Sequence, residues 1–214
     1  VTHGPLVIAK TSKGSSLKLL ASSIETKFAD EWQEKLRTYT GNSQPLSIVT
    51  LVDFSNQANT WLQLTSIDQS TGNQMHVAWD PITGVIQHDL SFNNYSGTIS
   101  MPKLTVSTPE WNFNVAQINL KLDSQKNASG FSNKNRFETK NLSYTKLETQ
   151  QVNLEDIAAD IELSTTDGKL AVNLTASVAN SQIAQQKFAQ DNFKILINNI
   201  NDGALGTLPS LKGF

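Results

Sequence analysis

The sequence predicts a mainly β fold, in which one domain is built on a long, twisted or curved antiparallel sheet of about ten to twelve strands. Two observations predict this class. Segments in which apolar and polar residues alternate recur along most of the chain, and turn residues separate them. No regular alternation of strands and helices appears, which argues against a parallel doubly wound sheet. We therefore expect a single β-rich domain over residues 1–214 with two helices, one near 29–40 and a short one at the C-terminal end.

The helix near 29–40 is predicted because its apolar residues follow the helical period and not the period of two that is typical of strands. Ala29, Trp32, Leu36 and Tyr39 recur at helical spacing and form one apolar stripe. Acidic residues come early in this segment and basic residues late, which suits the helix dipole. Gly41 is a suitable stop because glycine readily adopts the left-handed conformation that ends many helices.

Around Pro81 we predict a hairpin that joins strands 75–79 and 85–92 through the loop from Pro81 to Gly84. Pairing Asp80 with Val85 brings the apolar residues of both strands to one face, whereas a shift of one residue scatters them. This face is our candidate for binding an apolar ligand, and it comprises Met75, Val77, Trp79, Ile86, Leu90 and Phe92.

The middle of the chain is predicted with less regular elements. Pro102 is expected to separate two short strands, and a switch of apolar phase near Ala116–Gln117 predicts a β-bulge in the strand 111–122. The polar segment 126–135 is predicted to be a loop. The remaining strands are expected at 1–10, 15–28, 47–54, 61–67, 137–147 and 192–200.

The clearest hairpin is predicted at 157–178, because Asp167-Gly168 is a strong signal for a two-residue turn. Pairing Thr166 with Lys169 places apolar residues of both strands on one face and polar residues on the other. We expect the apolar face to meet a core. After the last strand, Asp202 is expected to cap the short C-terminal helix.

Bulk properties exclude several functional classes. The 214 residues carry a net charge of −2 with no basic stripe, which argues against a nucleic-acid partner. There is no cysteine, so disulfides and cysteine-based zinc sites are excluded. Because Val1 begins abruptly in a predicted strand, we expect the chain to be part of a longer protein, with any membrane anchor upstream.

No catalytic motif is evident, and we expect neither an enzyme nor a cofactor or metal. His76 and His88 are predicted on opposite faces of their hairpin, with His76 facing Asp89 as an exposed polar pair. The acidic residues of 155–162 are predicted to lie on a solvated strand face. The four tryptophans would line a ligand groove in one interpretation and fill the core in the other.

Three segments carry a resemblance: Val1–Leu6 with its His-Gly-Pro sequence, Tyr95–Val106 with its strand-Gly-strand pattern, and Phe193–Leu208 with a strand followed by Asn-rich and Ala-Leu elements. In this order and spacing they resemble the bacterial YdgA family, whose function is uncharacterised. The resemblance implies a protein of the bacterial periplasm, held to the inner membrane by an upstream anchor, and it offers no catalytic residues to carry over.

Three functions follow as hypotheses. The first is an envelope β-sheet module that binds a lipid or another apolar ligand through an apolar sheet face. The second is a structural or interaction module that self-associates as a homodimer, or docks an envelope protein, through an edge strand or an apolar patch. The third is an enzyme whose site the sequence hides.

Overall fold

The structure is a computed structural model that describes residues 2–11, 14–25, 29–70, 74–128, 130–146 and 150–201. The mainly β prediction is confirmed: a single sheet contains 13 strands, with the order β1-β2-β3-β4-β7-β8-β9-β10-β11-β12-β13 and with β5 and β6 at its side. The elements are β1 (Thr2–Thr11), β2 (Gly14–Glu25), α1 (Asp30–Thr40), β3 (Leu46–Asp53), β4 (Gln57–Leu64), β5 (Ile67–Ser70), β6 (His76–Trp79), β7 (Ile82–Asp89), β8 (Tyr95–Ser107), β9 (Trp111–Asn127), β10 (Gly130–Lys146), β11 (Gln150–Thr166), β12 (Lys169–Ile183) and β13 (Gln186–Asn201).

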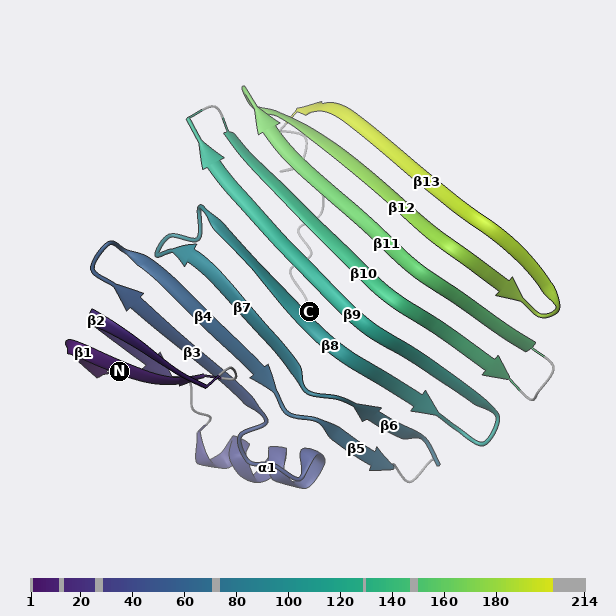
Figure 1. The fold of residues 1–214 in the computed structure, drawn as a ribbon, viewed down its shortest axis with the longest axis horizontal. Helices are drawn as coiled ribbons and strands as arrows, with labels where there is room; N and C mark the ends of the chain where they lie inside the picture. The colour runs from purple at the N-terminus through teal and green to yellow at the C-terminus, as the bar shows by residue number, and fades with distance from the viewer. Residues whose placement is uncertain are drawn as a thin grey trace.

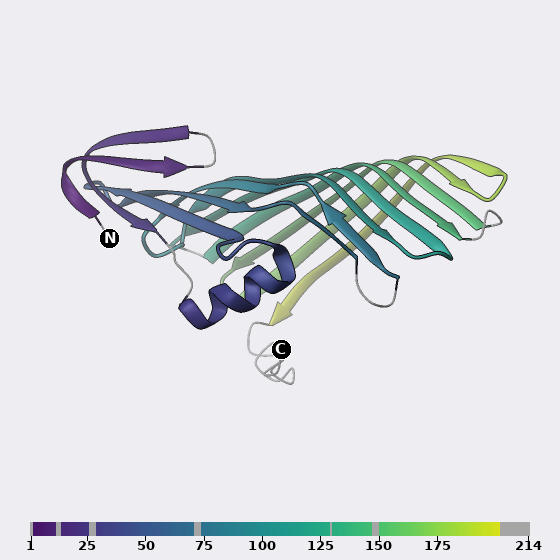
Figure 2. The ribbon, with the colours of Figure 1, turned by 90° about the horizontal axis from the view of Figure 1, so that it is seen from below.

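The sheet is one broad antiparallel layer, as Figure 1 shows. Seen from below it bends, with the β1–β2 hairpin folded back over one side and α1 lying on the other (Figure 2). No second layer of strands covers the sheet within the described residues. The C-terminal helix expected after Asp202 lies outside the described residues.

Helix α1 matches its prediction. Asp30 and Glu31 occupy the first turn and Arg37 the last, which complements the helix dipole. Gly41 adopts the left-handed conformation with φ 71°, and its backbone N–H donates to the Arg37 carbonyl at 2.9 Å. No helix in the described parts of the chain has the length and apolar character needed to cross a membrane.

The 157–178 hairpin is confirmed in register and is longer than expected. Thr166 pairs with Lys169, and the ladder runs from there through Ile161–Leu174 to Ile157–Val178. The expected core contact is wrong, because no second layer packs on this face within the described ranges. Its residues are mostly half-buried, and Ile161 is 40% exposed.

The predicted hairpin around Pro81 is wrong. Strands β6 and β7 do not pair with each other but follow one another along β8, while β5 and β4 accompany them on the other side. The chain reverses between Ser70 and His76, which are paired. Pro81 interrupts a long strand instead of starting a turn, because proline lacks the N–H that a ladder requires. His76 therefore contacts Asp68, with 2.7 Å between Nε2 and Oδ1, and not Asp89.

The predicted loop at 126–135 is also wrong, because β9 continues to Asn127 and β10 begins at Gly130. Nor does Pro102 end a strand, since β8 passes through it from Tyr95 to Ser107. The polar residues of 126–135 and Pro102 led to the predictions of a loop and a strand break. A sheet that is open to solvent tolerates both within its strands.

A line of irregular residues crosses the sheet and explains its apolar pattern. Each ladder skips one to three pairs at this line and then resumes in the same register, for example between Ile118–Met101 and Ala116–Lys103. We call it the crease, and it comprises Thr65, Pro81, Pro102, Gln117, Lys140, Asp156, Ala179 and Gln190.

The crease inverts the side-chain alternation in every strand that it crosses. Gln117 and Asp156 have positive φ values of 55° and 48°, which is the left-handed backbone that turns a strand locally. The apolar residues of β9 therefore change from odd positions up to Val115 to even positions from Ile118 onward, as the sequence predicts at this point. The predicted one-sided bulge is not found, since the neighbouring strands are irregular at the same line and the register does not shift.

A small core lies where the β1–β2 hairpin folds over the sheet. Val7 of β1 packs with Val49 and Leu51 of β3, and Trp61 contacts this cluster. Leu51 is 1% exposed and is the largest fully buried side chain among the described residues. This cluster holds the β1–β2 hairpin against the end of the sheet over which it folds.

We expect Leu51→Ala to lower the free energy of unfolding by about 3 kcal/mol, because it removes buried methyl groups and leaves a cavity. Ile8→Ala, next to Val7 but 65% exposed, should change it by no more than about 0.5 kcal/mol. Urea denaturation of both variants checks this, and equal losses would show that the hairpin does not cover the sheet as described.

Candidate apolar binding face

The sheet presents two chemically different faces because side chains alternate along each strand, and the inversion of this alternation at the crease keeps the apolar residues on one face. On one face, paired residues of adjacent strands form apolar rows on both sides of the crease. We call this surface the apolar face. Its central rows are Leu62, Gly84, Ile99, Leu120, Phe137, Ala159, Ala176 and Phe193 before the crease, and Ile67, Trp79, Leu104, Val115, Leu142, Leu154, Ser181 and Phe188 beyond it.

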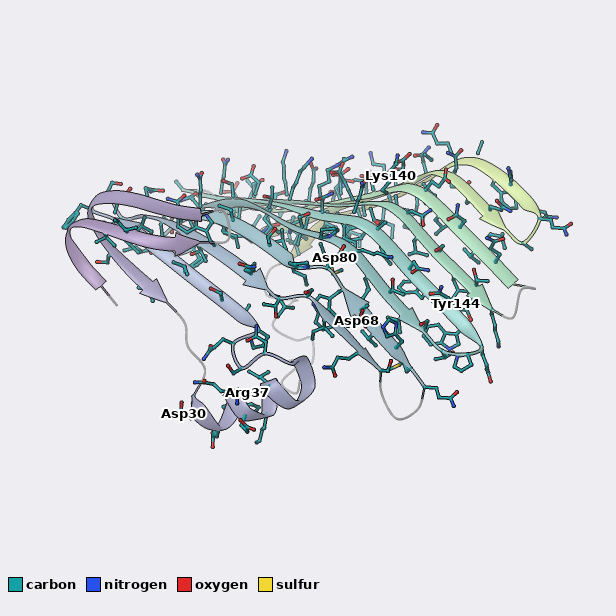
Figure 3. All side chains as sticks on the ribbon, turned by 60° about the horizontal axis from the view of Figure 1, so that its bottom comes forward. Asp30, Arg37, Asp68, Asp80, Lys140 and Tyr144 are labelled. Atoms are coloured by element: carbon teal, nitrogen blue, oxygen red, sulfur yellow. The ribbon has the colours of Figure 1, made fainter. Side chains whose placement is uncertain are left out.

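The opposite face, called here the polar face, carries a ladder of charged groups. Figure 3 shows Lys140 on the polar face and Tyr144 on the apolar face, on the side where α1 lies. Arg136 donates to Glu138 at 2.8 Å and to Asp160 at 2.7 Å, and Lys121 approaches Glu138 at 3.2 Å. Lysine side chains also pair with two further acidic residues of β11, Lys140 with Asp156 and Lys134 with Glu162, while Glu155 accepts hydrogen bonds from Asn153 and Asn180. Three of the four acidic residues in segment 155–162 therefore form ion pairs with β10.

Hydrogen bonds from Arg136, and then from Lys121, lower the pKa of Glu138, so its ionised form stabilises the folded state. This contribution is complete above the ordinary glutamate pKa and is lost as the pH falls through the lowered folded value. We expect the stability of the wild type to fall more steeply than that of Glu138→Gln below about pH 4.3. Glu110→Gln, in an exposed turn, should retain the wild-type slope in acid denaturation; an unchanged slope in Glu138→Gln would contradict the assigned contacts.

The apolar face is large and accessible. From Phe131 to Lys146 along β10 it extends on the order of 50 Å, and from β4 to β13 about 34 Å, at the usual strand spacings. Most of its large side chains are half-buried, Phe137 and Phe193 are 36% and 57% exposed, and Val115 is buried. The chain exposes 14070 Å², whereas a compact protein of 23.5 kDa exposes about 9,800 Å². Contiguous apolar patches on ordinary monomers reach only about 300–600 Å².

Three of the six residues predicted for ligand binding lie on this face, namely Val77, Trp79 and Ile86, and Met75 directly precedes β6. The residues of β6 and β7 lie on the same face because the crease at Pro81 inverts the side-chain alternation, and not because the two strands form a hairpin. The Trp79 indole N–H donates to the Thr65 carbonyl at 3.0 Å, which fixes the ring beside the crease. Their role in binding remains a prediction.

The other two predicted residues, Leu90 and Phe92, lie in the turn after β7 and are 53% and 56% exposed. Asp89 organises this turn by accepting hydrogen bonds from the backbone of residues 91, 93 and 94 and from the Asn94 side chain, which lowers the pKa of Asp89. The turn brings the Phe92 ring to 3.8 Å from the His88 ring, in a stacked geometry.

The apolar face also contains a group of uncharged polar residues at the end nearest this turn. We call it the polar patch, and it comprises Thr60, His88, Tyr95, Ser124, Asn133 and Asn135.

Hydrogen bonds connect much of the polar patch. The His88 Nε2 atom lies 2.9 Å from the Thr60 hydroxyl, the Asn133 amide donates to the Tyr95 hydroxyl at 2.7 Å, and Asn135 donates to Asn133 at 2.6 Å. The Asn135 Oδ1 atom is buried without a hydrogen-bond partner among the described residues. The protein alone therefore leaves this patch incompletely satisfied.

Sequence reasoning missed Asn133 and Asn135 because it placed them in a loop. The alternation of Phe131, Asn133, Asn135 and Phe137 was the available signal, since two aromatic residues frame the amides at period two. His88 and His76 do lie on opposite faces, and no three His, Asp or Glu residues within the described ranges are arranged to hold a metal ion.

Comparisons with known proteins give one result. The family model described as a bacterial protein of unknown function, DUF945, matches residues 1–210. No curated protein and no solved structure matches the chain. The chain therefore belongs to the DUF945 family of bacterial proteins of unknown function.

Proposed function

We propose that this protein is a non-catalytic module of the bacterial cell envelope that binds a lipid or another apolar ligand on its apolar face. The observation that carries the proposal is the size of that face, about 50 by 34 Å, without a covering layer among the described residues. Exposed apolar area of this extent is costly in water and marks a binding surface.

The envelope location rests on the sequence. The resemblance of the Val1–Leu6, Tyr95–Val106 and Phe193–Leu208 segments to the YdgA family supports a periplasmic protein with an upstream anchor. A binding role also fits the acidic groups of β11, three of which form ion pairs with lysine or arginine of β10.

An interaction module is the second candidate, and edge strand β13 favours it. Residues 184–198 are exposed, and β13 pairs only with β12 among the described strands. Its apolar residues lie on both faces, with Leu196 56% exposed on one and Ile197 45% exposed on the other. A long apolar edge of this kind can accept a further strand from a second copy or another envelope protein.

Titration with N-phenyl-1-naphthylamine, an uncharged probe that fluoresces in apolar surroundings, tests the lipid proposal. We expect a saturable fluorescence increase that oleate or monoolein reverses, because both would occupy the same face. An increase that neither competitor reverses would show nonspecific probe binding. A protein that gives no increase, yet dimerises in sedimentation experiments, would favour the interaction module.

A further inference from the structure

The two ends of the apolar face differ, and this difference predicts how a ligand lies on it. One end carries the polar patch, in which hydroxyl and amide groups interrupt the apolar rows. At the other end the rows contain Val77, Val106, Phe113 and Val152, and the Trp111 ring lies 6.4 Å from that of Tyr144. A ligand with one polar end would place it at the patch, because burying a polar group among apolar side chains without hydrogen bonds is costly.

Charge is confined to the two ends of the apolar face on β9 and β10. Lys126 follows Ser124 by two residues, at the end of the polar patch, and Lys146 pairs with Trp111 at the opposite end. Between these two lysines, the face carries no Asp, Glu, Lys or Arg on the described strands from β4 to β12. Across the described residues, Lys126 forms no ion pair.

The polar patch also offers hydrogen-bond donors to a ligand. Because the Tyr95 hydroxyl accepts from Asn133, its own proton remains to donate, and the Asn133 amide has a second N–H. Together with the Lys126 ammonium, these groups suit one small anionic oxygen head. One lysine balances a single negative charge, which matches a carboxylate better than a phosphate monoester.

We infer that the ligand of the apolar face is a long-chain carboxylic acid bound in one direction. Its carboxylate lies at Lys126 and the Tyr95–Asn133 pair, and its chain runs over the row of Ile99 and Leu120 toward the crease. This inference rests on the proposed function, and it adds the class of ligand and its orientation. The carboxylate cannot lie further along the face, because the interior rows contain no cation to pair with it.

Oleate binding to Lys126→Glu and to the matched variant Lys146→Glu tests the orientation. We expect Lys126→Glu to raise the dissociation constant for oleate about tenfold by replacing an attraction with a repulsion. Lys146→Glu should change it by less than about twofold, since its charge lies at the opposite end of the face, far beyond a Debye length from the carboxylate. A loss with Lys146→Glu instead, or equal losses, would overturn the orientation.

Monoolein, which has the same chain but an uncharged head, tests the class of ligand. We expect Lys126→Glu to weaken monoolein binding much less than oleate binding, and we expect the wild type to prefer oleate. Equal affinities for the two, or tighter binding of oleoyl lysophosphatidate, would overturn the assignment of a carboxylic acid while leaving the proposed function intact. If none of these three ligands binds the wild type, the proposed function itself fails.

Discussion

Replacing Ile99 with aspartate is expected to weaken binding of N-phenyl-1-naphthylamine at least about a hundredfold, because the probe would have to desolvate a carboxylate. Ile99 lies in the middle of the apolar face, where it pairs with Gly84 and Leu120. The neighbours of residue 99 in its row are all apolar, so no side chain there can pair with the new carboxylate and draw it away from the ligand. Fluorescence titration of the purified variant measures the effect.

The control is the adjacent residue. Thr98 points to the polar face, is exposed and pairs with Lys121, so Thr98→Asp introduces the same charge beside a cation. This variant should bind the probe like the wild type. Both variants should retain the β-sheet circular dichroism spectrum, because position 99 is only half-buried. Equal binding by the two variants would place the ligand elsewhere.

Gly97→Ala is expected to lower the free energy of unfolding by about 3 kcal/mol, at the upper end of the usual cost of overpacking. A Cβ atom at this position would lie 2.4 Å from the Val85 carbonyl oxygen and 2.9 Å from the Ile86 Cα atom. These are backbone atoms of the central strand β7, which is paired on both sides and cannot withdraw. Only glycine fits this close approach of two strands.

Gly84→Ala is the matched control for this prediction. There a Cβ atom would meet the Cδ2 atom of Leu62 at 2.8 Å, at the far end of a flexible side chain. Leu62 can move aside, and we expect a loss of about 1 kcal/mol. Urea denaturation curves compare the two. A smaller loss for Gly97→Ala than for Gly84→Ala would contradict the tight pairing of β7 and β8.

The register of a hairpin was predictable from sequence only where the turn itself identifies it. Asp167-Gly168 has one favoured turn geometry, so every pair from Thr166–Lys169 to Ile157–Val178 follows from it. Pro81 and Gly84 also look like a turn, yet they interrupt and continue a strand. Local composition cannot distinguish a turn from a continued strand at Pro81–Gly84, because pairing with the neighbouring strands β4 and β8 decides which one forms.

The crease could be predicted in one strand but not across the sheet. The phase switch at Ala116–Gln117 is visible in the sequence, and an isolated bulge is its ordinary explanation. Only the strand order shows that Gln117 lies between Pro102 and Lys140, so that the irregularities line up. The same limit applies to the site, because Tyr95 and Asn133 are 38 residues apart and meet only through β9.

The most direct test of a lipid-binding apolar face is native mass spectrometry of the protein purified from bacterial cells without detergent, followed by organic extraction of what travels with it. We expect a stoichiometric added mass in the wild type, identified in the extract as a long-chain apolar molecule and absent from Ile99→Asp. A clean mass of the chain alone in wild-type protein that also fails to take up added oleate and monoolein would contradict this expectation.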